Sequence, residues 1–136
     1  MLDRDGPGVI DFQDAVTGPL AYDLVSLLRD CYIVWPDDRV YGWVEDYRRR
    51  LVAGGIQVDP ARFRRWFDLM GLQRHLKVLG IFCRLWYRDG KAGYLADLPR
   101  VWRYVHDVGG RYPEIAPLVA LLQARIGARD LTQPAA

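Results

Sequence analysis

The amino-acid sequence predicts a mainly α-helical domain, with strand signals only near its start. From Leu20 to Ile126, apolar residues recur every three or four positions, the spacing that places them on one side of a helix. Glycine and proline residues interrupt this pattern at intervals, as they do at helix ends. With 136 residues, 51% of them hydrophobic, the chain is large enough to form one domain with its own core.

The first predicted element is a short β-hairpin. Residues 2–3 and 9–11 are the strand candidates, and the glycine- and proline-containing residues 4–8 between them favour a turn. The second strand candidate leads Asp11 directly into another turn, so we expect its carboxylate at the edge of a rigid element.

Two helices are predicted next. The first begins at Leu20 and is expected to end before Trp35-Pro36, and the second covers residues 39–53 and stops at Gly54-Gly55. The exposed side of the second helix is expected to carry two ion pairs at a spacing of four residues, Glu45–Arg49 and Asp46–Arg50.

Four more helices are predicted in the rest of the chain. Asp59-Pro60 is an N-cap followed by proline at the first helical position, and Gly71 is expected to separate this helix from the next. The four helices cover residues 60–70, 72–88, 97–108 and 113–126. Residues 127–136 are expected to form a flexible tail.

The composition excludes several classes of protein. No apolar run approaches the roughly 20 residues that span a bilayer, and the acidic, glycine-rich start does not form a secretory signal, so no membrane association is expected. Cys31 and Cys83 lie in apolar helical contexts. We expect them to be free buried thiols of a cytoplasmic protein, in preference to a disulfide or a metal site.

Charge is unevenly distributed along the chain. Residues 1–38 contain eight aspartates and two arginines, a net charge of −6, whereas residues 39–136 have a net charge of +8. An acidic start suits Mg2+ and phosphate chemistry, and a basic remainder suits an anionic partner. A nucleic acid is not the expected partner, because no recognisable nucleic-acid-binding motif accompanies the basic residues.

Residues 9–15, Val-Ile-Asp-Phe-Gln-Asp-Ala, carry the most chemical information. An aspartate between a strand and a turn, such as Asp11, either caps local backbone N–H groups or presents its carboxylate to a divalent metal. The segment continues with Gly18-Pro19 and then Tyr22-Asp23, which places a second aspartate twelve residues after Asp11 and at the start of a helix.

These residues resemble the aminoglycoside phosphotransferase family of small-molecule kinases. Similar blocks follow at residues 26–30, 71–82, 87–91 and 94–100, so the resemblance covers about residues 2–126. Within the family, the chain is most similar to bacterial kinases that phosphorylate the anomeric hydroxyl of N-acetylmuramate and N-acetylglucosamine in peptidoglycan recycling.

The resemblance implies a fold and a function. Residues 1–126 would form the helical C-terminal lobe of a protein-kinase-like fold, with the hairpin as a remnant of the preceding part. The intact enzyme would use Mg2+ and ATP, and its acceptor would be a small sugar or an aminoglycoside. The family's N-terminal lobe and its His-x-Asp catalytic loop have no counterpart here, since neither His75 nor His106 fits the pattern. The resemblance thus implies the C-terminal part of a kinase, with no catalytic residue of its own and little activity by itself.

The resemblance also implies roles for the acidic residues. Asp11 would hold Mg2+ against the β- and γ-phosphates of ATP, as the metal-binding aspartate of kinases does. Gln13 and Asp14 would contact a metal or the sugar, although a solvated turn carboxylate is an equal alternative for Asp14. Asp23 would be a buried residue that accepts hydrogen bonds from the catalytic loop and fixes its shape.

Basic residues of the predicted helix 72–88 form a further candidate site. Four of them fall near one face, which is either the solvated side of an amphipathic helix or part of the sugar cleft: Arg74, Lys77, Arg84 and Arg88. In the cleft, a cation could bind the lactyl carboxylate that distinguishes N-acetylmuramate from N-acetylglucosamine. His75 is a further candidate for substrate binding, with a packed core histidine as the favoured alternative.

A second function from a different class is a non-catalytic helical module derived from a kinase. Without the preceding lobe, apolar surface would be exposed, and such surface favours oligomers or a protein partner.

Overall fold

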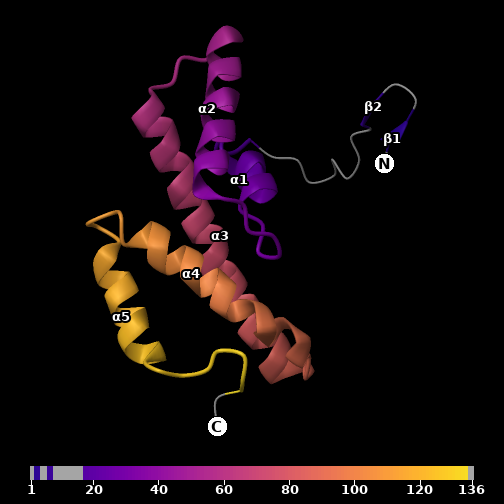
Figure 1. Cartoon of the computed structure of the whole chain (residues 1–136), viewed down its shortest axis with the longest axis vertical. Coiled ribbons are helices and arrows are strands. Elements are labelled where there is room, and N and C mark those ends of the chain that lie inside the picture. The colour runs from indigo at the N-terminus through magenta and orange to yellow at the C-terminus, as the bar shows by residue number, and fades with distance from the viewer. Residues whose placement is uncertain (1, 4–5, 8–16, 135–136) are drawn as a thin grey trace.

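The computed structural model of the chain describes residues 2–3, 6–7 and 17–134. Within these residues it contains two short strands, five α-helices and one 3-10 helix, so the predicted mainly α-helical fold is confirmed. In Figure 1, one long helix, α3, runs through the middle, with α1 and α2 beside its first half and α4 crossing its second half. None of the helices in the described part is long and apolar enough to cross a lipid bilayer.

The two strands form a minimal antiparallel pair. β1 (Leu2–Asp3) pairs with β2 (Gly6–Pro7), with Leu2 opposite Pro7 and Asp3 opposite Gly6. The predicted hairpin pairs residues 2–3 with residues 9–11, which lie outside the described residues. That hairpin is therefore not confirmed.

The first helix, α1 (Tyr22–Leu28), is shorter than predicted. Arg29 leaves helical geometry at φ −122° and ψ 43°, and the Asp30 carboxylate accepts a hydrogen bond from the Tyr32 N–H at 3.2 Å. This local side-chain bond offers the backbone an alternative to helix, which is why the apolar spacing alone overestimated the length. The result is an irregular connection between residues 29 and 36.

The second helix, α2 (Asp37–Ala53), ends where predicted and begins two residues earlier than expected. Gly55 follows its end at φ +91°, in the left-handed region that glycine adopts without strain. Of the two predicted ion pairs, Glu45–Arg49 forms at 3.2 Å. The second prediction is wrong, because Asp46 pairs with Arg49 at 3.8 Å and not with Arg50.

The third helix, α3 (Pro60–Asp89), is one continuous helix of 30 residues where two were predicted. It begins as expected, since the Asp59 carboxylate accepts a hydrogen bond from the Arg62 N–H at 2.8 Å. Gly71 is buried inside the helix, and a Cβ built there would lie 3.7 Å from Val25 Cγ1 of α1. Glycine lowers helix propensity by about 1 kcal/mol, but packing against α1 outweighs this local cost.

Three shorter elements follow. They are the 3-10 helix η1 (Ala92–Asp97), α4 (Leu98–Gly109) and α5 (Ala116–Ile126). The predicted cap at Asp97 makes no side-chain bond to the backbone; its carboxylate instead binds Arg100 at 2.7 Å. Gly109 allows α4 and α5 to approach closely, because a Cβ there would lie 2.6 Å from Val119 Cγ2.

Two hydrophobic clusters form along α3. The first joins α1 and α2 to the first half of α3, and its buried residues are Ala21, Val25, Leu28, Val40, Val44, Phe63 and Phe67. The second joins the other half of α3 to η1 and α4, and its buried residues are Phe82, Leu95, Leu98 and Val101. Leu131 packs against the second cluster, so this residue of the predicted tail is anchored. Cys31 and Cys83 are free thiols, and they are half-buried where the sequence analysis expected buried side chains.

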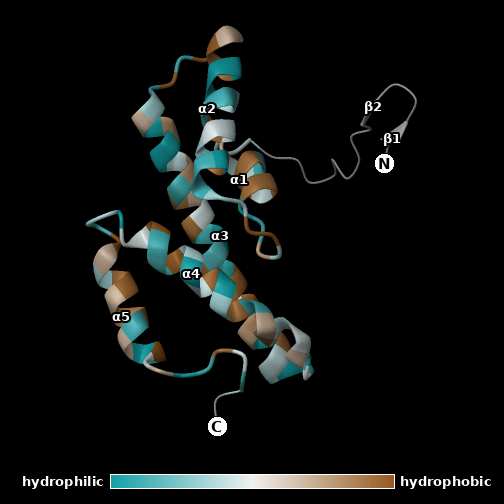
Figure 2. Cartoon of the chain, viewed as in Figure 1, coloured by the Kyte–Doolittle hydropathy of each residue, from teal (hydrophilic) through white to brown (hydrophobic). Residues whose placement is uncertain are grey.

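Not all apolar surface is covered. Figure 2 shows that much of α1 is coloured as hydrophobic. Leu27 on this helix is 71% exposed, and Leu20 and Tyr22 at its start are also exposed.

Candidate functional site

The three residues predicted to meet the metal lie outside the described part of the chain. They are Asp11, Gln13 and Asp14. Among the residues that the structure describes, no group of three or more His, Cys, Asp or Glu side chains could hold a metal ion. The metal-binding roles of these three residues stay predictions.

Asp23 lies in the first turn of α1, as the sequence predicts, but its side chain is exposed. The expectation of a buried carboxylate is therefore not met in this structure. An exposed carboxylate stays hydrated and avoids the cost of burying a charge. The role of Asp23 in supporting the catalytic loop stays a prediction.

The basic stripe on α3 is mostly solvated. Lys77 and Arg84 are exposed, and Arg74 is half-buried with its guanidinium 4.8 Å from the centre of the Tyr22 ring. This stacking directs Arg74 toward the start of α1. A role of these three residues in sugar binding stays a prediction.

His75 is a core side chain, the alternative that the sequence analysis favoured. It is 3% exposed, its ring stacks on Tyr104 of α4 at 4.6 Å, and its Nε2 donates a hydrogen bond to the Arg29 carbonyl at 2.9 Å. Burial lowers the pKa of His75 to about 4, so the ring is neutral at pH 7. Its contacts join the end of α1 to α3 and α4.

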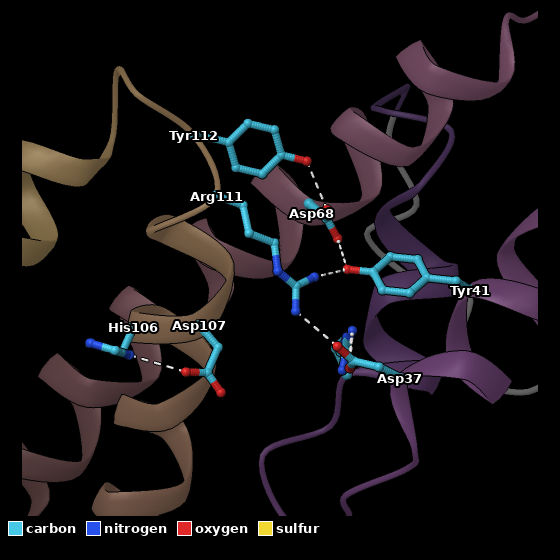
Figure 3. A network of polar contacts seen from close by, with 8 residues as sticks. Asp37, Tyr41, Asp68, His106, Asp107, Arg111 and Tyr112 are labelled. Carbon is cyan, nitrogen blue, oxygen red and sulfur yellow. Dashed lines mark hydrogen bonds and ion pairs between the residues drawn. The ribbon is translucent and has the colours of Figure 1, made fainter.

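A polar network surrounds Asp68, whose side chain is 3% exposed in the middle of α3. Its two carboxylate oxygens accept hydrogen bonds from the Tyr41 hydroxyl at 2.9 Å and the Tyr112 hydroxyl at 2.7 Å. Figure 3 shows these tyrosines approaching Asp68 from two sides. The pKa of each tyrosine is raised, mainly by burial and secondly by the neighbouring Asp68 carboxylate. Both phenols therefore stay protonated and remain donors at neutral pH.

The same network continues to Asp37 at the start of α2. Arg111 donates to the Tyr41 hydroxyl and to Asp37 Oδ2, the latter at 2.8 Å (Figure 3). Arg29 Nη2 lies 2.9 Å from Asp37 Oδ1. Burial opposes ionisation of Asp37, but the hydrogen bonds from Arg111 and Arg29 outweigh it and lower its pKa. A carboxylate is thus held between two guanidinium groups.

Beside this carboxylate is a pocket of about 270 Å³, here called the arginine pocket. Its charged lining comes from two segments: Arg29 and Asp37 from residues 29–37, and Arg100, Arg103, Asp107 and Arg111 from residues 100–111. Four arginines thus face two carboxylates. Trp35 and Tyr104 add aromatic walls. A pocket of this kind can bind a small anionic group.

The arginines of the pocket differ in how far they are already paired. Arg100 donates to Asp97 and to the Cys31 carbonyl, at 2.7 and 3.0 Å. Arg103 is exposed and has no hydrogen bond or ion pair with any described residue. Arg29 is 5% exposed, and its Nη2 is paired with Asp37 Oδ1 at 2.9 Å. The pocket therefore retains donor capacity at Arg103.

The sequence analysis missed this pocket. One signal was available, because Arg100, Arg103, Asp107 and Arg111 recur at the three- and four-residue spacing of a helix face. The contribution of residues 29–37 could not be found in this way, since it comes from a segment about seventy residues away.

Comparison with known proteins gives the relatives of this chain. Residues 1–66 match the phosphotransferase enzyme family. The chain is 52% identical over 133 residues to an N-acetylmuramate/N-acetylglucosamine kinase of Neisseria meningitidis serogroup B, covering 96% of this chain and 40% of that protein. The family match covers the first 66 of its 136 residues, and over them the chain is similar to the phosphotransferase enzyme family. No solved structure matches it.

Other proteins with the same printed name match over similar lengths. The N-acetylmuramate/N-acetylglucosamine kinase of Pseudomonas putida is 49% identical over 132 residues, covering 95% of this chain and 39% of that protein. The kinase of the same name from Caulobacter vibrioides is 36% identical over 121 residues, covering 87% of this chain and 32% of that protein. The predicted resemblance is confirmed, and the chain spans about 40% of the length of the relative from Neisseria.

Proposed function

We propose that this chain is part of an ATP-dependent kinase that phosphorylates the anomeric hydroxyl of N-acetylmuramate and N-acetylglucosamine. The observation that carries the proposal is the 52% identity over 133 residues to a protein named for these two sugars. The reaction would belong to peptidoglycan recycling in the cytoplasm.

The proposed roles follow phosphoryl-transfer chemistry. Catalysis of this type depends on positioning and on neutralising the charge of the phosphates, which Mg2+ supplies when it is bound. Asp11 is the proposed metal ligand, and Gln13 and Asp14 are proposed to contact a metal or the sugar. Asp23 is proposed to support the catalytic loop when that loop is present. The helices described above would provide the structural support for these groups.

A replacement experiment tests this proposal. In the kinase of Neisseria meningitidis, the matched 133 residues are replaced by this chain, and ATP-dependent phosphorylation of N-acetylmuramate is measured in a coupled assay. We expect the hybrid to retain activity, because the two segments are 52% identical over 133 residues. A folded hybrid that binds nucleotide but phosphorylates neither sugar would contradict the proposal.

The same hybrid tests Asp11. Asp11→Asn keeps the size of the side chain but removes the negative charge that the metal needs, so we expect phosphorylation to fall by at least about a hundredfold. The matched control is Asp38→Asn, the same substitution at an exposed position in the first turn of α2. Equal activities of the two variants would reject Asp11 as the metal ligand.

A second candidate function is a non-catalytic module that acts through association. It is favoured by the exposed apolar side chains at α1, above all Leu27 at 71% exposure. Size-exclusion chromatography with light scattering tests it. A single defined oligomer that Leu27→Glu dissociates would support the module, whereas a monomer would count against it.

A further inference from the structure

We propose that the arginine pocket is a subsite for a carboxylate group on a small sugar ligand, and that Arg103 determines the preference for that ligand. This inference rests on the proposed function, because of the two proposed sugars only N-acetylmuramate carries a carboxylate, on its lactyl group.

The charges of the pocket favour an anion. Four arginines line it against two carboxylates, and Asp107 is partly engaged elsewhere, with its Oδ1 3.1 Å from His106 Nδ1 (Figure 3). Asp37 already accepts from Arg111 and lies beside Arg29. The guanidinium of Arg103 has no partner among residues 17–134, so it is free to bind a ligand carboxylate through two parallel hydrogen bonds.

The buried side of the pocket is held in place by contacts within the fold. Arg29 is 5% exposed, and its Nη2 is paired with Asp37 Oδ1 at 2.9 Å, so its guanidinium adds a fixed positive charge to the pocket wall. The Tyr104 ring lies below the same guanidinium, 5.4 Å from its central carbon, and holds it in place.

The size of the pocket limits the ligand group. Whole small-molecule sites measure about 300–1,000 Å³, so a pocket of about 270 Å³ suits a substituent better than a complete sugar with its nucleotide partner. The aromatic walls from Trp35 and Tyr104 can cover the apolar methyl of a lactyl group while the arginines bind its carboxylate.

NMR titration of the 136-residue chain with each sugar tests the inference. We expect N-acetylmuramate to shift the amide signals of Arg103 and of residues 29–37 and to bind about tenfold more tightly than N-acetylglucosamine. Arg103→Ala should remove this difference by weakening the binding of N-acetylmuramate alone. Arg103→Lys should restore part of the difference, because lysine keeps the positive charge but cannot donate the two parallel hydrogen bonds of a guanidinium. Arg103 is exposed, so both variants should fold.

Arg84→Ala is the matched control, since Arg84 is an exposed arginine on the α3 stripe. If Arg84→Ala loses the preference for N-acetylmuramate and Arg103→Ala keeps it, the inference is overturned, and the carboxylate subsite lies on the basic face of α3. Equal binding of the two sugars, unchanged by Arg103→Ala, would overturn the subsite but leave the proposed function intact. Binding of neither sugar would overturn the subsite and also remove the support for sugar recognition by this chain.

Discussion

The two ends of α3 are packed in apolar surroundings, whereas its middle is polar. At one end Phe63 and Phe67 are 1% and 0% exposed among aliphatic and aromatic neighbours, and at the other Phe82 packs against η1 and α4. Between them lie Asp68 and His75, two buried polar side chains that bind groups from other elements. The apolar ends hold the helices together, and the polar middle fixes how α1, α2 and α4 meet at the arginine pocket.

The largest expected effect on stability comes from removing a buried aromatic ring at one apolar end of α3. Phe67→Ala removes a fully buried ring from the first cluster and should lower the free energy of unfolding by about 3–5 kcal/mol, measured by urea denaturation. Leu27→Ala is the control, because Leu27 is 71% exposed and its truncation should change stability by less than about 0.5 kcal/mol. Similar losses for both variants would contradict the assignment of the core.

The buried polar side chains of α3 should make the stability of the fold depend on pH. The pKa of His75 is lowered by burial to about 4, from an ordinary value of 6.5 in the unfolded chain. Between these two values the unfolded state binds more protons than the folded state, so stability falls as the pH is lowered through this range. The full shift corresponds to about 3 kcal/mol.

Denaturation at several pH values measures this effect. His75→Phe keeps an aromatic ring against Tyr104 but cannot titrate, so its stability should depend less on pH between about 6.5 and 4 than that of the parent chain. His106→Gln is the matched control at an exposed position and should keep the parent slope. If the parent and His75→Phe curves run parallel, the ring is not held neutral by burial.

The smallest expected effect concerns the hydroxyl groups on Asp68. Tyr112→Phe removes one of the two hydrogen bonds to the carboxylate and should cost about 1 kcal/mol of stability. Combined with Asp68→Asn, the two changes should be non-additive by about 1 kcal/mol, because they act on the same bond. Tyr87→Phe, at a 66% exposed tyrosine, should cost almost nothing. Strict additivity would contradict the contact.

Much of the fold could be predicted from the sequence, because helix periodicity is local. The end of α2 at Ala53 and the start of α3 after Asp59 follow from neighbouring residues alone. The break expected at Gly71 was wrong, since glycine weakens a helix locally while burial against Val25, 46 positions earlier, sustains it. Local preference predicts where helices can end, and tertiary packing decides whether they do.

The candidate site was harder to predict for the same reason. The arginine pocket joins residues 29–37 to residues 100–111, and no local pattern relates these two segments. The exposed arginines Arg84 and Arg103 look alike in the sequence. Only the fold distinguishes them, because it places Arg103 beside a buried guanidinium and an aromatic wall.

The length of α3 has a consequence for how the chain opens. A helix of 30 residues rises by about 45 Å, and both hydrophobic clusters depend on it. Neither half can melt without breaking backbone hydrogen bonds in the segment that Asp68 and His75 tie to the other helices. The amide hydrogens between these two residues should therefore exchange with solvent only when the whole domain unfolds, and should be the last in the chain to do so.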